Sequence, residues 1–265
     1  MSEVRSELNQ LRSASQTSNG IALEVKNLQT YLYTRWGVVK AVDGVSLTLR
    51  DGECFGLVGE SGSGKTMLGL SLIRLLPKPA GRIVGGQVLL GGKDLVTKTE
   101  AEMREVRGRR ISMVLQDPMT ALDPIFTVGK QLSETITIDG DMQGPAIVER
   151  ATELLKMVRI PAPAERLAAY PFQMSGGMRQ RVVGAVALAR EPSIIIADEP
   201  TTSLDVTTQA NYLRLLKRLQ ERLNLTMIFI THDFGIVARV CHRVGVMYAG
   251  KLVEVGDVEE IFDNP

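Results

Sequence analysis

Residues 59–66 read GESGSGKT. They follow a short apolar run at 54–58, which predicts a buried strand, and they lead into a run at 64–76 that predicts a helix. The segment matches the pattern G-x-x-x-x-G-K-[ST], a loop that binds phosphate between a strand and a helix. Because this context is also present, the phosphate-binding interpretation is favoured over the alternative, a flexible Gly/Ser turn.

The chemistry of this loop is that of a phosphate cradle. Glycines let backbone N–H groups converge on the β- and γ-phosphates of a nucleotide, and the N-terminus of the following helix adds a partial positive charge. Lys65 adds a full positive charge, and Thr66 is placed to bind Mg²⁺. The residues predicted to bind the nucleotide are Gly59, Glu60, Ser61, Gly62, Ser63, Gly64, Lys65 and Thr66.

A second motif, IIIADE at 194–199, is an apolar strand that ends in two carboxylates. Ligands of α/β proteins bind at the carboxyl edge of the sheet, so this strand would deliver both acids there. We expect Asp198 to hold Mg²⁺, directly or through water, and Glu199 to be the general base for a water that attacks the γ-phosphate. Alone, the motif could be an ordinary strand end; paired with residues 59–66 it indicates nucleotide hydrolysis.

Strands and helices alternate along the rest of the chain, which predicts an α/β fold with a parallel sheet covered on both faces. β-Rich runs at 21–25 and 45–49 predict a small antiparallel lobe near the N-terminus. The Gly/Pro-rich stretch 77–86 predicts a break. Residues 117–175 hold helical patterns and turns but no convincing strand, so we expect an inserted helical lobe there.

Composition places the chain among ordinary globular proteins. Its 265 residues are 44% hydrophobic and 23% charged, with a formal net charge of +1, which excludes bulk disorder and gives no global field for nucleic acid or an anionic membrane. No apolar run reaches the roughly 20 residues that span a bilayer. We expect a flexible tail at 1–20 and one domain at 21–265. Cys54 and Cys241 fit no metal-ligand spacing and are expected to be buried thiols.

A third motif points to a family. Residues 170–181, YPFQMSGGMRQR, lie between the phosphate loop and the acidic strand and resemble the signature of ABC ATPases. LQDP at 115–118, SLD at 203–205 and THD at 231–233 resemble the Q-loop, the D-loop and the switch histidine of that family. The resemblance implies a P-loop NTPase core with a parallel sheet, a small antiparallel β-subdomain and a helical subdomain.

The signature also has a rationale in its own residues. Ser175 and two glycines open a helix, so a hydroxyl and bare N–H groups point outward as a second anion site. The resemblance implies that two subunits face head to tail and that each ATP lies between one P-loop and the opposite signature. The residues implied are Ser175, Gly176, Gly177 and Met178 in the signature and Ser203, Leu204 and Asp205 in the D-loop.

Roles near the γ-phosphate follow from the same resemblance. His232, after a strand predicted at 226–231, is expected to contact the γ-phosphate; the alternative is a structural histidine. Gln116 would sense Mg²⁺ and the attacking water, so it joins Thr66 and Asp198 in the expected metal site.

Adenine recognition calls for an aromatic ring ahead of the P-loop, since stacking contributes on the order of 1 to 3 kcal/mol. Trp36 and Tyr33 both qualify, and spacing favours Trp36; alternatively, either ring caps the small sheet. Two positions depart from the family pattern. Met178 stands where glutamine is commonest, and Met67 stands where a hydroxyl often touches the α-phosphate.

Within the family, the motifs look most like ATP-binding subunits of dipeptide, oligopeptide and nickel importers. This implies ATP and Mg²⁺ as cofactors, and a location at the cytoplasmic face of the cell membrane. The implied partners are a second ABC ATPase, with a heterodimer favoured, two transmembrane permease subunits and an extracytoplasmic substrate-binding protein, with no nucleic acid. The sequence does not name the cargo. Longer relatives continue past the equivalent of 264–265, so the chain is either a short member or a truncated one.

Two rival classes of protein have sequence features that differ from those of this chain. A soluble ABC ATPase of DNA repair or translation would usually carry tandem cassettes or a long coiled-coil insertion, and neither pattern occurs in the 265 residues. A regulator without catalysis would need a lost acid or histidine, whereas Glu199 and His232 are both present.

Overall fold

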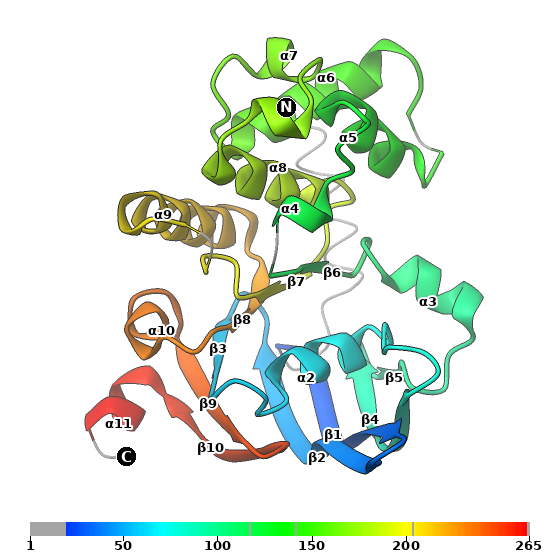
Figure 1. The fold of residues 1–265 in the computed structure, drawn as a ribbon, viewed down its shortest axis with the longest axis vertical. Coiled ribbons are helices and arrows are strands. Elements are labelled where there is room, and N and C mark those ends of the chain that lie inside the picture. Colours follow the sequence, from blue (N-terminus) through cyan, green and yellow to red (C-terminus); the bar gives the residue numbers. More distant parts are fainter. Residues whose placement is uncertain (1–19, 117, 141, 203, 264–265) are drawn as a thin grey trace. The chain divides into compact units, whose positions relative to one another are not determined.

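The computed structural model describes residues 20–116, 118–140, 142–202 and 204–263. The chain divides into two compact units (Figure 1). The first joins Met1–Met103 to His232–Pro265, and the second is Arg104–Thr231. The predicted tail at 1–20 lies, except for Gly20, outside the described residues.

The first unit contains a four-stranded antiparallel sheet in the order β2-β1-β4-β5. Its strands are β1 (Ile21–Thr34), β2 (Gly37–Arg50), β4 (Gly81–Leu90) and β5 (Lys93–Asp94). β1 turns its apolar side chains inward at alternate positions near its start, where Leu23 and Val25 are buried. The expected antiparallel lobe is therefore present, and its hairpin extends well beyond the two predicted runs.

The same unit holds a second group of strands, in the order β10-β9-β3. Its elements are β3 (Cys54–Val58), β9 (Arg243–Tyr248) and β10 (Lys251–Asp257), with helices α2 (Lys65–Leu72), α10 (Phe234–Val240) and α11 (Val258–Asp263). β3 pairs in parallel with β9, and every residue of β3 is buried, as expected for a strand covered on both faces. One small core is formed by Val58, Val237, Val244 and Val258.

The second unit contains three parallel strands in the order β8-β7-β6. They are β6 (Ile111–Val114), β7 (Ile194–Asp198) and β8 (Thr226–Ile230), and α8 (Gly176–Leu188) and α9 (Val206–Leu223) belong to the same unit. Every residue of β7 and β8 is buried. The helix α3 (Glu100–Val106) lies at the boundary of the two units.

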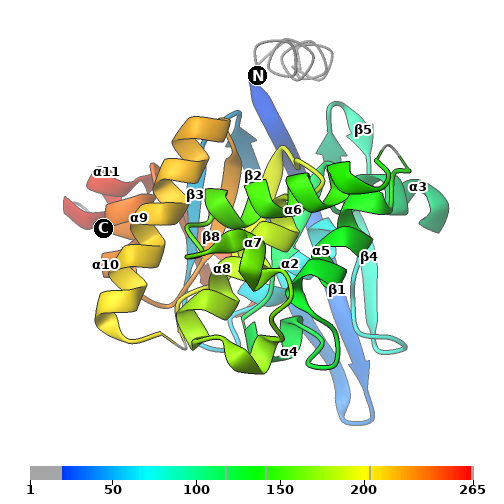
Figure 2. The ribbon, with the colours of Figure 1, turned by 90° about the horizontal axis from the view of Figure 1, so that it is seen from above.

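Between β6 and α8, the described residues contain helices and no strand. The elements are α4 (Pro118–Ala121), α5 (Val128–Thr137), α6 (Pro145–Met157), α7 (Pro163–Arg166) and the short 3₁₀ helix η1 (Pro171–Gln173). Figures 1 and 2 show α5, α6 and α7 gathered beside α8. Leu132 of α5 and Leu154 of α6 are fully buried. That these helices form one separate lobe with bounds at 117 and 175 stays a prediction.

Two predicted boundaries were wrong. The break expected at 77–86 ends early, because β4 begins at Gly81 and pairs there with Leu32 of β1. The helix expected to reach residue 76 ends at Leu72, since Arg74 has a left-handed backbone with φ 54° and the N–H of Leu75 bonds back to the carbonyl of Leu70. No helix in the described part of the chain has the length and apolar character needed to cross a bilayer.

Candidate active site

The loop at 59–66 joins β3 to α2 and is enclosed by backbone from neighbouring strands. Gly59 has φ 151°, and a Cβ there would lie 2.2 Å from the carbonyl oxygen of Met247 at the end of β9. Gly64 has φ 105°, and a Cβ there would lie 2.1 Å from the carbonyl oxygen of Ala41 in β2. Glycine is required at both positions because the loop passes against main chain that cannot move aside.

The carbonyl oxygens of this loop contact a buried cation, the ammonium group of Lys65. The Lys65 ammonium group donates to the carbonyl oxygens of Gly59 and Glu60, each at 2.8 Å, and the residue is only 5% exposed. α2 starts at Lys65, and its N-cap, Gly64, has no side chain to satisfy the first-turn N–H groups. A lysine and a helix N-terminus converging on a glycine loop suit a phosphate group, so the residues present fit a nucleotide.

The acidic strand end lies in the second unit, where Asp198 is the last residue of β7 and is 2% exposed. Glu199 follows with φ 44°, a left-handed conformation that costs of order 1 to 3 kcal/mol for a residue with a side chain. Its N–H donates to the carbonyl oxygen of Ile230 at 2.9 Å, which ties this backbone to β8. The structure thus places the two carboxylates on consecutive residues, one buried in the strand and one on a strained turn.

The carboxylate of Glu199 accepts two hydrogen bonds at the same oxygen. The Gln116 side-chain amide donates to Oε2 at 3.0 Å, and the Thr202 hydroxyl donates to Oε2 at 2.9 Å. Gln116 and Glu199 were both predicted as site residues, and the structure brings them together from segments 83 positions apart in the chain. Thr202 was not predicted.

The signature helix α8 begins at Gly176 with Ser175 as its N-cap, as its residue types predict. The Ser175 hydroxyl accepts from the N–H of Met178 at 3.3 Å and caps the helix. Ser175 and Gly176 are exposed, and a Cβ on Gly176 would have no atom of another described residue, apart from its own helix and chain neighbours, within 4 Å. The open N-terminus of α8 is therefore a second place in the chain where an anion fits.

The D-loop residues lead into α9. The N–H of Thr208 donates to the Asp205 carboxylate at 3.0 Å, which caps α9 and holds the pKa of Asp205 below its usual value. Leu204 is half-buried, and Ser203 lies outside the described residues. A Cβ on Gly177 would lie 2.6 Å from Cγ2 of Thr208, so the first turns of α8 and α9 are in close contact.

The remaining predicted site residues lie in the first unit. His232 is exposed and directly precedes Asp233, which caps α10. Trp36 is 84% exposed at the β1–β2 turn with the Arg35 guanidinium over its ring, and Tyr33 is 46% exposed with Arg82 over its ring. Neither ring is packed into the core.

Comparison with known proteins assigns the chain to a family. Residues 42–202 match the family described as "ABC transporter". The chain belongs to this family of transport ATPases.

Curated relatives cover nearly the whole chain. This chain is 50% identical over 243 residues to the oligopeptide transport ATP-binding protein OppD of Bacillus subtilis. The alignment covers 92% of this chain and 68% of OppD. The chain is 48% identical over 255 residues to a probable peptide ABC transporter ATP-binding protein, y4tR, of Sinorhizobium fredii, with 96% and 76% covered.

Solved structures agree with the fold. The dimeric structure of MJ0796, a bacterial ABC transporter cassette, superposes with a TM-score of 0.78 at 30% identity and covers 89% of this chain and 98% of that one. A dimeric post-hydrolysis state of the same cassette, bound to ADP and Pi, gives a TM-score of 0.77 at 29% identity. The ABC ATPase fold is thereby shown, and with it a domain that binds ATP.

Two features of the ABC transporter site escaped sequence reasoning. The walls of the P-loop come from Ala41 and Met247, which lie far from it in sequence and carry no motif. Thr202 did have a signal, because it follows Pro200 in a turn that starts at Glu199. A hydroxyl three residues after a predicted catalytic acid, across a proline turn, is a pattern that sequence analysis can use.

Proposed function

We propose that this chain is the ATP-hydrolysing subunit of an ABC importer for peptides. The observation that carries the hydrolytic part is the Glu199 carboxylate, one residue beyond the buried Asp198, with the Gln116 amide at 3.0 Å. The peptide class is supported by relatives that are named for oligopeptide and dipeptide transport and are 49–50% identical over 92% of the chain. Nickel or another small solute is the alternative cargo.

In the proposed reaction, residues 59–66 hold the β- and γ-phosphates of ATP, and Lys65 neutralises their charge. A water attacks the γ-phosphorus, its proton goes to Glu199, and the bond to the bridging oxygen of the ADP leaving group breaks. Thr66, Asp198 and Gln116 have oxygen donors that suit Mg²⁺, which when bound would offset phosphate charge. His232 contacts the γ-phosphate. Trp36, or Tyr33, stacks on the adenine.

The open N-terminus of α8 is proposed to serve a nucleotide held by another subunit. Ser175, Gly176, Gly177 and Met178 would cover that ATP, while Leu204 and Asp205, with Ser203, would form the D-loop contact. The facing subunit is a second ABC ATPase, either a copy of this chain or a similar one. Two permease subunits and an extracytoplasmic binding protein would complete the importer, with this chain at the cytoplasmic face of the membrane.

Replacement of the proposed base tests the hydrolytic role. We expect Glu199→Gln to lower kcat by about 10² to 10⁴ while ATP binding persists, because the amide cannot accept the proton of water. The matched control is Glu221→Gln, an exposed carboxylate on α9. Steady-state ATPase rates and titration with a fluorescent ATP analogue measure both quantities. Full turnover in Glu199→Gln would contradict the proposal.

Isolation from native membranes tests the transport role. The chain, purified under mild detergent, should bring two hydrophobic permeases and a second ATPase, which mass spectrometry identifies. The ATPase rate of the purified complex should rise on addition of the binding protein with di- or oligopeptides. Stimulation by nickel alone would replace the peptide assignment, and a lone ATPase with no membrane partner would overturn the importer.

A further inference from the structure

We propose that Thr202 is a positioning residue that fixes the orientation of the Glu199 carboxylate. The inference rests on the proposed function, in which Glu199 is the general base. Thr202 is not a catalytic residue in this scheme, since it acts on the carboxylate alone. Its hydroxyl donates to Oε2 of Glu199 at 2.9 Å.

The contact between Thr202 and Glu199 follows from a backbone turn that the local sequence favours. Glu199 to Thr202 form a turn in which the N–H of Thr202 donates to the carbonyl oxygen of Glu199 at 3.3 Å. Pro200 occupies the second position of the turn, where the fixed φ of proline suits the turn conformation. The turn thereby brings the Thr202 side chain next to the side chain of Glu199.

Hydrogen bonds at both ends keep the turn in place. On one side, the N–H of Glu199 donates to the carbonyl oxygen of Ile230 in β8. On the other, the Thr201 hydroxyl, 3% exposed, accepts from the side-chain amide of Gln209 in α9 at 3.2 Å. α9 is itself capped by Asp205, so the turn is held between a buried strand and a capped helix.

Two donors on Oε2 restrain the position of that oxygen of the Glu199 carboxylate. Gln116 approaches Oε2 from the segment after β6, and Thr202 approaches it from the turn. With one of these two donors removed, Oε2 is held less tightly and the carboxylate moves more freely about the last side-chain bond. General-base catalysis depends on the position of the accepting oxygen, and small displacements of a catalytic group cost large factors in rate.

The test compares Thr202→Val with Thr202→Ser in the full chain. Valine keeps the shape and removes the hydroxyl, and serine keeps the hydroxyl. We expect Thr202→Val to lower kcat about tenfold with KM for ATP changed less than about twofold, and Thr202→Ser to recover most of the rate. A non-hydrolysable ATP analogue should bind all three proteins equally, and their melting temperatures should agree, which excludes misfolding. Thr152→Val is the control, because its hydroxyl donates to the carbonyl oxygen of Val148 within its own helix, α6.

A double variant separates this inference from the proposed function. In a Glu199→Gln background, Thr202→Val should cause no further loss, because there is no carboxylate left to orient. Equal kcat for Thr202→Val and the unchanged chain, with Glu199→Gln inactive, would overturn the inference alone. A fully active Glu199→Gln would overturn the proposed function. A loss in Thr202→Val that appears in KM, or that serine does not recover, would also overturn the positioning role.

Discussion

The ammonium group of Lys65 is held at 2.8 Å by two carbonyl oxygens of its own loop, Gly59 and Glu60. These contacts keep a buried cation in place within the loop, where we propose that it binds a phosphate. Lys65→Ala should weaken ATP binding about 10- to 100-fold, because a charge-assisted bond to phosphate contributes about 1.5 to 3 kcal/mol. Titration with a fluorescent ATP analogue measures the loss, and Lys217→Ala, an exposed lysine on α9, is the control. Unchanged affinity in Lys65→Ala would rule out the cradle.

An ion pair in the second unit makes the stability of the folded chain depend on pH. Arg190 donates from Nε to Asp139 at 2.9 Å and from Nη2 to its other oxygen, and these bonds hold the pKa of Asp139 below its usual value of 3.8. The stabilisation is present above the usual pKa and is lost as the pH falls through the lower, folded value.

Asp139→Asn should therefore lower the free energy of unfolding by about 1.5 to 3 kcal/mol at neutral pH, since the residue is only 18% exposed. Its stability should fall less steeply than that of the unchanged chain below about pH 4. Urea denaturation at several pH values measures both effects, with Asp51→Asn, an exposed turn residue, as the control. Parallel stability curves for the two proteins would contradict this cause.

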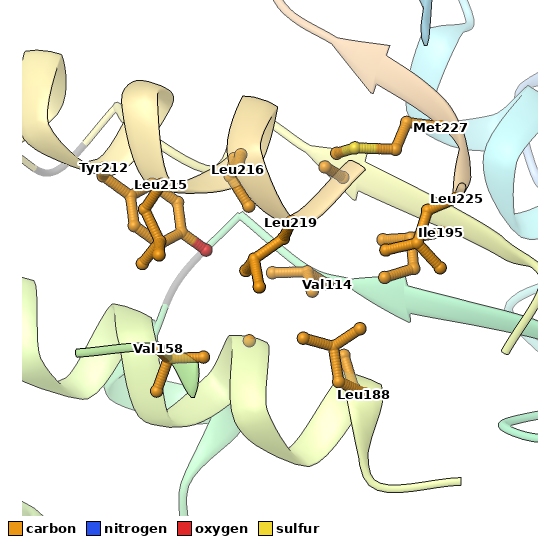
Figure 3. Close-up of a pocket in the computed structure, with 13 residues that line it drawn as sticks. Val114, Val158, Leu188, Ile195, Tyr212, Leu215, Leu216, Leu219, Leu225 and Met227 are labelled. Carbon is orange, nitrogen blue, oxygen red and sulfur yellow. The ribbon is translucent and has the colours of Figure 1, made fainter. Parts of the chain in front are cut away.

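At the scale of elements, α8 and α9 leave a small apolar cavity against the strands of the second unit. It measures about 20 Å³, and Figure 3 shows Tyr212 and Leu219 of α9 and Leu188 of α8 directed into it. Burial raises the pKa of Tyr212 to about 12, so its hydroxyl stays neutral. Gly184 lines the cavity, and outside its own helix the one described atom within 4 Å of a Cβ there is the Tyr212 hydroxyl oxygen, at 3.5 Å.

Gly184→Ala should raise the free energy of unfolding by about 1 kcal/mol. Alanine removes the cost of glycine inside a helix and places a methyl group in empty space. Gly56→Ala is the contrast, because its Cβ would lie 2.6 Å from Cγ1 of Val237 in a filled core, and it should destabilise. Thermal unfolding of both variants measures the difference. A lower melting temperature for Gly184→Ala would show that the cavity cannot accept the methyl group.

The elements that sequence analysis found are those whose signal is local. β3, β7 and α8 each combine an apolar or capped segment with a motif beside it, and all three are where they were predicted. β4 was missed at its start, because a Gly-rich segment becomes a strand only through its pairing with β1. The Gln116–Glu199 contact joins two residues that the motifs had predicted for the site, whereas the Thr202 contact depends on a turn geometry that motif matching ignores.

At the scale of the whole molecule, the described part of the chain places helix N-termini that fit phosphate in both units, at α2 and at α8. α2 in the first unit carries Lys65, while α8 in the second has Ser175 and exposed glycine but no lysine in its first turn. The arginine in that turn, Arg179, donates from Nε to the carbonyl oxygen of Met174, so we expect the site to hold a free nucleotide weakly. The site at the N-terminus of α8 is expected to bind more tightly to a nucleotide that another subunit already holds. This is the reason to expect ATP-dependent pairing of subunits.

Gly176→Asp tests this pairing without touching the P-loop. Gly176 is exposed at the start of α8 with open space around it, so an aspartate fits, and a carboxylate is favourable at a helix N-terminus. The folded chain should keep its melting temperature and its own ATP affinity within about twofold, while the new charge repels the phosphates of the facing nucleotide. In a Glu199→Gln background with ATP, the chain with glycine at 176 should elute with the facing ATPase subunit in size-exclusion chromatography, and the aspartate variant should elute alone. Gly176→Asn has nearly the same shape without the charge and should retain much of the pairing. If the aspartate variant pairs as well as the asparagine variant, the N-terminus of α8 does not face a bound nucleotide.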